Sequence, residues 1–400
     1  MTEAVVTTPA SGAVPHNSGY AARVLRDAFS QRAARLGLAW VALLLVLAVF
    51  APFIANSHPL LLSENGRWHS PLLASLTAGD VTLLIAFACL VVLIIRQPRF
   101  RHALAIFVGV LALAAVLSYA FIEPPRLVNY ETWRQAEAAG QYDWVIRAPI
   151  PYSPQDYQRD EGYTGLEAPL EADQRTHLFG TDENGADVLS RMIHASRIAL
   201  GIGFVATGIA MLIGIIIGGL MGYFSGVVDI IGMRLVEIFE AIPTLFLLLT
   251  FVAFFGRSLY MLMVIIGITS WSGYARYVRA EFLKLRKQDY VQAAIACGLP
   301  LPSILFRHML PNGIAPVLVG ASFGVASAIL AEAVLSFLGL GLVGDPSWGQ
   351  MLNQSILSSK FNWWMAFFPG GAIFLTVFAY NMMGEALRDA IDPHLRRESV

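Results

Sequence analysis

Long apolar runs, separated by shorter polar stretches, alternate along most of the chain. An α-helix needs about 20 predominantly apolar residues to cross a bilayer. The apolar runs predict eight membrane-spanning helices, at Leu36–Ile54, Val81–Ile95, Ala103–Ile122, Ile198–Met221, Phe239–Phe255, Leu259–Tyr274, Ile314–Leu340 and Trp364–Met383. The pattern therefore predicts an all-α polytopic membrane protein with both ends of the chain on the same side of the membrane.

Basic residues indicate which connections face the cytoplasm, because cytoplasmic loops carry an excess of lysine and arginine. One connection holds Arg96, Arg99 and Arg101, and residues 276–312 hold Arg276, Arg279, Lys284, Arg286, Lys287 and Arg307. Residues 123–190, in contrast, are dominated by acidic side chains such as Glu131, Asp143 and Asp187. We therefore expect residues 123–190 outside the cytoplasm, and the loop 276–312 and both termini inside it.

The spans divide the chain into five predicted segments. They are a cytoplasmic tail with an amphipathic helix (1–35), the first span with an additional hairpin (36–122), an extracytoplasmic segment (123–190), a core transmembrane domain (191–392) and a second cytoplasmic tail (393–400). Arginines alternate with apolar residues over Tyr20–Arg35, which is typical of a helix lying on an anionic membrane face; a soluble cap helix is the alternative. The extracytoplasmic segment is either a lid over the outer mouth or a plain connecting loop.

Composition supports a lipid environment. Of the 400 residues, 56% are hydrophobic and only 14% are charged, whereas a soluble domain carries about 25% charged residues. The net charge is −1, and no basic tract points to nucleic acid. Cys89 and Cys297 are the only cysteines, and the predicted topology places them in a span and in a cytoplasmic loop, which excludes a disulfide framework.

The stretch Gln288–Asn312 interrupts this pattern with a short helix, a break and a second short helix. On a helix that begins at Asp289, four residues fall on one face by the i, i+3, i+4 rule: Tyr290, Ala293, Ala294 and Cys297. The two alanines leave this face nearly flat, so another protein could approach it closely. An ordinary interfacial helix pair is the alternative.

Glycine and proline define the joint between these two helices. Gly298 can take the left-handed conformation that ends a helix, and Pro300 and Pro302 prevent the helix from resuming. We expect Ser303 to cap a second helix, Ile304–Leu310, and Pro311 to set the turn before the next span.

Ala293–Ala294, Gly298 and Leu310–Pro311 resemble the EAA loop of binding-protein-dependent ABC importer permeases, although Gln292 stands where that motif has glutamate. In that family the loop is the coupling helix that contacts the ATPase subunit. The resemblance thus implies ATPase-coupling roles for Tyr290, Ala293, Ala294, Gly298, Leu310 and Pro311.

Further segments resemble the C-type permeases of the dipeptide, oligopeptide and nickel group, notably His177–Leu200, Met233–Leu249 and Glu332–Gly349. This resemblance covers Thr176–Asp392. Upstream, Ile54–Leu73 and Trp144–Pro151 look like the subgroup that imports microcin C and peptides.

The resemblance implies a type I ABC importer permease of the bacterial inner membrane, with a six-span core to which the hairpin 81–122 is added. It implies that peptides or peptide-like compounds are the cargo. The expected partners are a homologous permease in a heterodimer, two ATPase subunits that bind ATP and Mg²⁺, and an extracytoplasmic solute-binding protein. No catalytic residue, cofactor or metal is expected on this chain.

Small and ionisable residues inside the spans are candidates for packing and transport. Gly214, Gly218, Gly222 and Gly226 recur every four residues, a spacing that allows helices to pack closely in lipid. Ionisable groups in a membrane are costly and often functional, so Glu332 is a pathway candidate. Trp271 and Phe323 are aromatic candidates for the same route, although aromatic residues in spans are more often lipid-facing or core.

Other functions are less well supported by the sequence. An ion-coupled secondary transporter would need no ATPase and would use Glu332 as a proton carrier. A permease for nickel complexes shares the same plan, and a membrane-embedded hydrolase would need a histidine near Ser322, which the sequence lacks. No Walker A string occurs in the 400 residues, and Gly339–Gly344 matches a dinucleotide pattern without the strand that it requires.

Overall fold

The computed structural model describes residues 26–123, 130–158, 165–170, 176–342, 344–360 and 362–391. The predicted tails, residues 1–19 and 393–400, lie outside these ranges, as do the first residues of the predicted helix Tyr20–Arg35. Within the described part, the chain turns at Phe29 and Ser30 and the first long helix, α2, begins at Arg32. Ala28 and Ala34 are fully buried against Ala386, so this region packs on the end of the chain's last helix.

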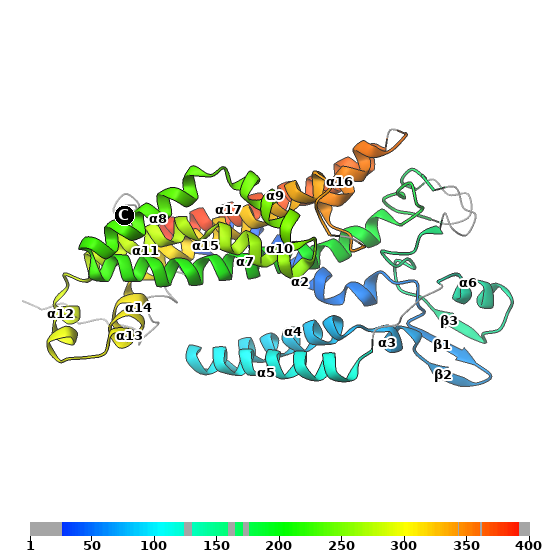
Figure 1. Ribbon diagram of the computed structural model, residues 1–400. Coiled ribbons are helices and arrows are strands. Elements are labelled where there is room, and N and C mark those ends of the chain that lie inside the picture. Colours follow the sequence, from blue (N-terminus) through cyan, green and yellow to red (C-terminus); the bar gives the residue numbers. More distant parts are fainter. Residues whose placement is uncertain are drawn as a thin grey trace, which may run out of the picture.

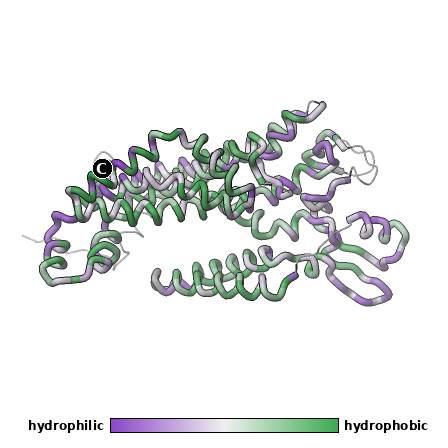
Figure 2. The backbone as a smooth tube through the Cα atoms, in the orientation of Figure 1, coloured by the Kyte–Doolittle hydropathy of each residue, from purple (hydrophilic) through white to green (hydrophobic). Residues whose placement is uncertain are grey.

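The molecule is elongated, with a long helical bundle between two different ends (Figure 1). A small sheet lies at one end, which we call the sheet end, and the short helices α12 to α14 lie at the other, which we call the α12 end. Figure 2 shows that hydrophobic positions dominate the long helices, whereas hydrophilic positions concentrate at the two ends. This distribution is that of a protein that crosses a membrane along its long axis.

Among the described residues, six helices are long and apolar enough to cross a membrane. They are α2 (Arg32–Ile54), α4 (Ala78–Arg96), α5 (Phe100–Phe121), α7 (Val188–Phe224), α15 (Ala315–Phe337) and α17 (Trp363–Ile391). Each contains one of the predicted spans or most of it. α7 is much longer than predicted, with 37 residues, because the polar residues before Ile198 already belong to the helix.

The two remaining predicted spans are not single straight helices. Phe239–Phe255 is divided between α8 (Gly226–Ala241) and α9 (Thr244–Phe255), which meet at an angle of 83°. Pro243 explains the break, because proline has no N–H to donate to the preceding turn. Leu259–Tyr274 is divided at Ser270 between the short α10 (Leu259–Thr269) and α11 (Trp271–Leu285). Counting the bent pair as one span gives up to seven spans by length and composition among the described residues, one fewer than predicted.

Helix α7 is the centre of the bundle. It packs most extensively against α11 and also contacts α10, α15 and α2, and α15 packs against α17. Ile202 and Ile329 are fully buried at these contacts. The core therefore gathers around one long helix, which runs from the sheet end to the α12 end (Figure 1).

Helices α4 and α5 form the predicted additional hairpin, which is attached to the bundle mainly near the sheet end. Asp80 near the start of α4 forms an ion pair with Arg197 of α7, whose guanidinium also donates to backbone carbonyls of α2. The rings of Phe50 and Phe87 meet edge to face, with centroids 5.6 Å apart. Elsewhere most of the hairpin surface is exposed apolar side chains, as expected of helices in contact with lipid.

The sheet end contains short strands that the all-α prediction missed. β1 (Leu61–Glu64) pairs with β2 (Arg67–His69) and with β3 (Trp144–Ile146), both antiparallel. Asn65 and Gly66, with φ of 51° and 74°, connect β1 to β2 in the left-handed conformation that tight hairpins need. Two short helices complete this end, α3 (Pro71–Ser75) and α6 (Glu131–Ala138). Among the described residues, the segment 123–190 thus contributes β3 and α6 to a small folded unit at this end.

Candidate functional site

The α12 end consists of short helices joined by a glycine, as predicted. α12 spans Asp289–Ala296, and Gly298 follows with φ of 71°. The N–H of Gly298 donates to the carbonyl of Ile295 (2.9 Å), and the N–H of Leu299 donates to that of Ala294 (3.2 Å). These bonds form the Schellman motif that ends a helix at a left-handed residue, so the angle at which α12 meets the next helix is fixed by backbone hydrogen bonds.

Helix α12 presents two different faces, which corrects the predicted single face. Tyr290, Ala293 and Cys297 are exposed, but Ala294 is buried together with Val291. Both buried side chains belong to a hydrophobic cluster that also contains Phe282 of α11, and α12 packs on the π-helical segment that follows it. Ala294 therefore anchors α12 to its own chain, whereas most of the rest of α12, including Tyr290, Ala293, Ile295 and Cys297, is exposed for contact with another protein.

The second short helix also differs from the prediction. A continuous helical run starts at Leu301, passes through a π-helical segment, Ile304–Met309, and ends in α14 (Leu310–Gly313). Ser303 makes no capping hydrogen bond. Pro302 lies in the first turn of α13 (Leu301–Ser303), and Pro311 lies in the first turn of α14, where proline is tolerated, so neither residue breaks the run. Leu310 packs against the cluster around Phe282.

Three of the four predicted packing glycines lie where α7 meets α11. A Cβ atom at Gly214 would be 2.4 Å from the Cβ of Tyr274, one at Gly218 would be 2.3 Å from the carbonyl oxygen of Ala275, and one at Gly222 would be 2.5 Å from the Cβ of Phe282. No side chain fits at such distances. α7 and α11 are therefore in direct backbone contact over these three turns.

Gly226 does not belong to this group. α7 ends at Phe224, and Gly226, with φ of 57°, starts α8 with no atom near the position of a Cβ. Its role is to permit the reversal of the chain between two helices, because this conformation is unfavourable for other residues. The periodic spacing was misleading here because the helix ends before the fourth glycine.

A cavity of about 340 Å³ lies between α7, α10, α11 and α15. Buried residues form its floor, among them Thr207 and Tyr274. Exposed residues form its mouth, namely Ser270, Gly273, Tyr277 and Ser327. The Tyr274 hydroxyl donates to the carbonyl of Gly320 at 3.3 Å, which links α11 to α15 across the cavity.

The predicted pathway residues separate into two groups. Phe323 lines the cavity. Glu332 and Trp271 do not: Glu332 is 2% exposed and accepts a hydrogen bond from Ser336 (2.5 Å), and Trp271 is 3% exposed, with its ring 5.3 Å from that of Phe239. These two side chains pack within the chain's own core in this structure, and their role in the transport pathway stays a prediction.

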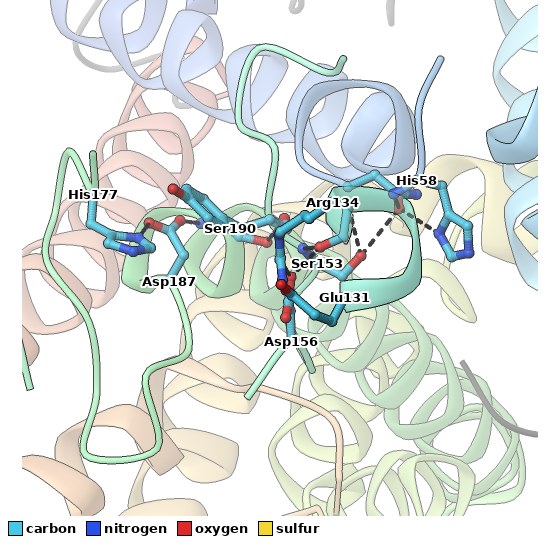
Figure 3. Close-up of polar contacts among 11 residues, drawn as sticks. His58, Glu131, Arg134, Ser153, Asp156, His177, Asp187 and Ser190 are labelled. Carbon is cyan, nitrogen blue, oxygen red and sulfur yellow. Dashed lines mark hydrogen bonds and ion pairs between the residues drawn. The ribbon is translucent and has the colours of Figure 1, made fainter. Parts of the chain in front are cut away.

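Polar contacts organise the sheet end around Asp156, which accepts from Ser57 and forms an ion pair with Arg134 (Figure 3). The hydroxyl of Ser153 donates to the side chain of Asn56 at 3.1 Å, and the ring of His58 contacts the same side chain at 3.0 Å. Burial lowers the pKa of His58 below its usual value, and the nearby carboxylate of Asp156 opposes this in part. This lowered pKa favours the neutral form of His58.

The start of α7 is fixed by a second set of polar contacts. Asp187 accepts from the N–H of Ser190 (2.7 Å) as the N-cap of α7 and contacts the ring of His177 at 2.9 Å (Figure 3). Asp182 forms a buried ion pair with Arg191 one loop away. The polar turn Gly180–Asp187 thus makes caps and turns, as its composition predicts. In the described part of the chain, no group of three potential metal ligands comes together.

Comparison with known proteins agrees with this architecture. The family model of the binding-protein-dependent transport system inner membrane component matches residues 214–397, and that of the N-terminal TM domain of oligopeptide transport permease C matches residues 19–66. The chain is 39% identical over 219 residues to the oligopeptide transport system permease protein OppC of Haemophilus influenzae, an alignment that covers 54% of this chain and 70% of that protein. The chain belongs to the family of binding-protein-dependent transport system permeases.

Other relatives extend the match. This permease is 39% identical over 254 residues to the di/tripeptide transport system permease protein DppC of Pseudomonas aeruginosa, which covers 63% of this chain and 82% of that one. It is 40% identical over 225 residues to the dipeptide transport system permease protein DppC of Bacillus subtilis, with coverages of 55% and 70%. The chain is thus an ABC importer permease subunit, and a multi-pass protein of the inner membrane.

Sequence reasoning missed most of the cavity of this permease. Thr207, Ser270 and Ser327 are ordinary small polar residues within apolar runs, and Tyr274 was expected at the end of a span. Their shared signal is a hydroxyl at a position predicted to lie in the membrane. That signal becomes specific only when the packing of α7, α11 and α15 brings the hydroxyls to one cavity.

Proposed function

We propose that this permease is one half of an importer for peptides or peptide-like compounds. The observation that carries the proposal is the identity of about 40% to permeases whose names specify oligopeptides, dipeptides and di/tripeptides. Its partners are a homologous permease, two ATPase subunits and an extracytoplasmic solute-binding protein. The chain itself has no enzymatic activity and binds no nucleotide, since ATP and Mg²⁺ bind to the ATPases.

The α12 end is the contact for an ATPase, and it lies in the cytoplasm together with both termini. Exposed apolar side chains support this contact: Tyr290, Ile295 and Leu299 are each between 37% and 40% exposed at this end of the molecule. The coupling residues are Tyr290, Ala293 and Gly298 on the exposed side, with Ala294, Leu310 and Pro311 holding the helices in position. The sheet end lies outside and forms part of the outer mouth.

Packed helices transmit the movement of the ATPases to the cavity. Closure of the ATPases displaces α12, and Val291 and Ala294 transmit the displacement to α11 through the hydrophobic cluster that they share with Phe282. α11 continues from this contact to Tyr277, Tyr274 and Gly273, which line the cavity. A movement at the cytoplasmic face therefore changes the cavity between α11 and α15 directly.

Chemical labelling of Cys297 tests this proposal. Replacing Cys89 by serine leaves Cys297, which is exposed at the end of α12, as the only thiol. We expect maleimide to react with Cys297 in the isolated permease and to react at least about tenfold more slowly in the complex with the ATPases. In parallel, the reconstituted complex should take up peptides only with ATP and the binding protein. Unprotected Cys297 together with uptake driven by a proton gradient alone would instead indicate a secondary transporter.

A further inference from the structure

One buried hydroxyl in the cavity has no hydrogen-bond partner. Thr207 is 6% exposed, it lines the floor of the cavity, and its Oγ1 accepts and donates no hydrogen bond. An unsatisfied polar group in an apolar environment is costly and requires an explanation. A group that enters the cavity would supply one once the side chain of Thr207 rotates toward it, because Oγ1 itself is buried.

The mouth of the cavity is polar, although α7, α10 and α15 around it are apolar helices. Ser270 and Ser327 are exposed there, and Tyr277 is 56% exposed. The backbone is also interrupted at this place, since α10 ends at Thr269, whose hydroxyl donates to the carbonyl of Ile265 (2.9 Å). Irregular backbone at membrane depth is tolerated where it is buried in protein or lines a water-filled cavity. This face of the bundle therefore points to the transport route and not to lipid.

The residues that line the cavity include hydroxyl, aromatic and small side chains but none that is charged. A charged group that entered the cavity would find no counter-ion there, and burial of an unpaired charge is strongly unfavourable. Amide groups, in contrast, can bond to the hydroxyls, and apolar side chains can pack on the rings of Tyr274 and Tyr277. The volume of about 340 Å³ is at the lower end of the range for small-ligand sites and fits a short segment of an extended peptide.

We propose that this cavity is a selectivity site at which the permease binds an uncharged segment of its cargo, with Thr207 bonded to a peptide group and the tyrosines contacting an uncharged side chain. The inference rests on the proposed function and adds to it the class of cargo segment that this subunit accepts. It assigns a specificity role to Thr207, Tyr277 and Ser327.

The first test compares two threonines in the reconstituted complex with its sister permease, ATPases and binding protein. Thr207→Val removes the unpaired hydroxyl and keeps the side-chain shape, and Thr250→Val is the matched control, because Thr250 is an exposed residue of α9 that bonds to its own helix. We expect Thr207→Val to reduce uptake of a neutral tripeptide by about two- to tenfold, the value of one hydrogen bond, with ATP hydrolysis retained. Uptake equal to that of the control variant would overturn the assignment of Thr207.

The second test introduces opposite charges at the mouth. Ser327→Asp is expected to favour tripeptides with a central lysine over those with a central glutamate by about tenfold relative to the wild type, and Ser327→Lys is expected to have the opposite effect. Comparing the two peptides within each variant cancels that variant's own cost of insertion, so the direction of the change reports contact with cargo. Equal loss of uptake for both peptides in both variants would contradict the proposal. If the wild-type complex moves no peptide at all, the proposed function is what fails.

Discussion

At Gly218 the distance between α7 and α11 depends on the absence of a side chain. The nearest atom to a Cβ at this position is a backbone oxygen, that of Ala275, and it cannot move aside as a flexible side chain could. In lipid, where helices gain little from the hydrophobic effect, such close packing supplies much of the association energy. The close approach of α7 to α11 therefore depends on glycine at single positions such as Gly218.

Replacing Gly218 by valine should separate α7 from α11. We expect a loss of about 1–3 kcal/mol of stability from overpacking, seen as a lower melting temperature of the purified permease. Gly208→Val, also on α7, is the matched control, because no atom lies within 4 Å of a Cβ there, and it should leave the melting temperature unchanged. Equal effects of the two substitutions would show that the α7–α11 contact does not limit stability.

The sequence predicted such positions only in part. Gly214, Gly218 and Gly222 were identified from their spacing, and the structure places all three at one contact, but the same spacing wrongly included Gly226. Glu332 was singled out because a carboxyl group in a membrane is rare, whereas the buried contact with Ser336 depends on packing. Thr207 was missed because a threonine in an apolar run carries no distinctive signal before its neighbours in space are known.

Among the elements, α12 depends most on one conformation. Gly298 adopts φ of 71° with no atom within 4 Å of a Cβ, so a substitution there is strained by the backbone and not by a clash. A β-branched residue is disfavoured in this conformation by about 1–2 kcal/mol, whereas asparagine tolerates it. Valine and asparagine at position 298 should therefore differ in their effect on the angle between α12 and α13, and comparing them tests the importance of that angle.

Gly298→Val should uncouple ATP hydrolysis from uptake, because α12 no longer holds a fixed angle to the rest of the chain. We expect uptake to fall by about tenfold or more while the variant remains in the membrane and the ATPases remain active. Gly298→Asn should retain most of the uptake. The measurements are ATP hydrolysis and peptide uptake in the same proteoliposomes. Normal uptake by the valine variant would count against a coupling role for α12.

The additional hairpin is held to the bundle by a charge pair near the sheet end. The side chains of Arg197 and Asp80 are 18% and 8% exposed, so removal of one partner leaves the other poorly solvated. We expect Asp80→Asn to cost up to about 3 kcal/mol and to increase hydrogen exchange in α4 while α7 and α11 stay protected. Glu237→Gln, in the exposed pair with Arg234, is the control and should have an effect below about 1 kcal/mol. Unchanged exchange in α4 would show that its apolar contacts suffice.

Elements that were long and uniformly apolar could be predicted from the sequence, and short or interrupted ones could not. The break between α8 and α9 falls at Pro243, near the start of the predicted span Phe239–Phe255, where Glu240 and Pro243 were the available indications. The strands β1 to β3 have three or four residues each, too few for an alternating pattern to be recognised. Asn65–Gly66 was a usable signal for the β1–β2 hairpin, because this dipeptide favours the tight turn that the structure shows.

At the scale of the whole molecule, two groups of helices meet at the cavity. α7 and α11 are in backbone contact at three glycines, and α12 shares a hydrophobic cluster with Phe282 of α11. α15, on the other side, contacts α11 at the cavity through the ring of Tyr274, which packs closely against Gly324. The first contact cannot slide without clashes, whereas the second spans an open space. We expect α11 and α12 to keep their distance from α7 and to change their distance from α15 at the cavity.

Distances between pairs of spin labels can test this expectation in a variant without native cysteines. Lys284→Cys, near the end of α11, is combined either with Gly208→Cys on α7 or with Ser327→Cys on α15. All three positions are exposed, and Gly208 has open space around it. When ATP binds to the complex, the distance between residues 284 and 208 should stay constant and that between residues 284 and 327 should change by several ångströms, as hinge and shear movements do.

If both distances change by the same amount, the bundle deforms as a whole, and α11 does not connect the ATPase contact to the cavity as a rigid lever. If neither changes, the transport movement lies between the two permease subunits and not within this one.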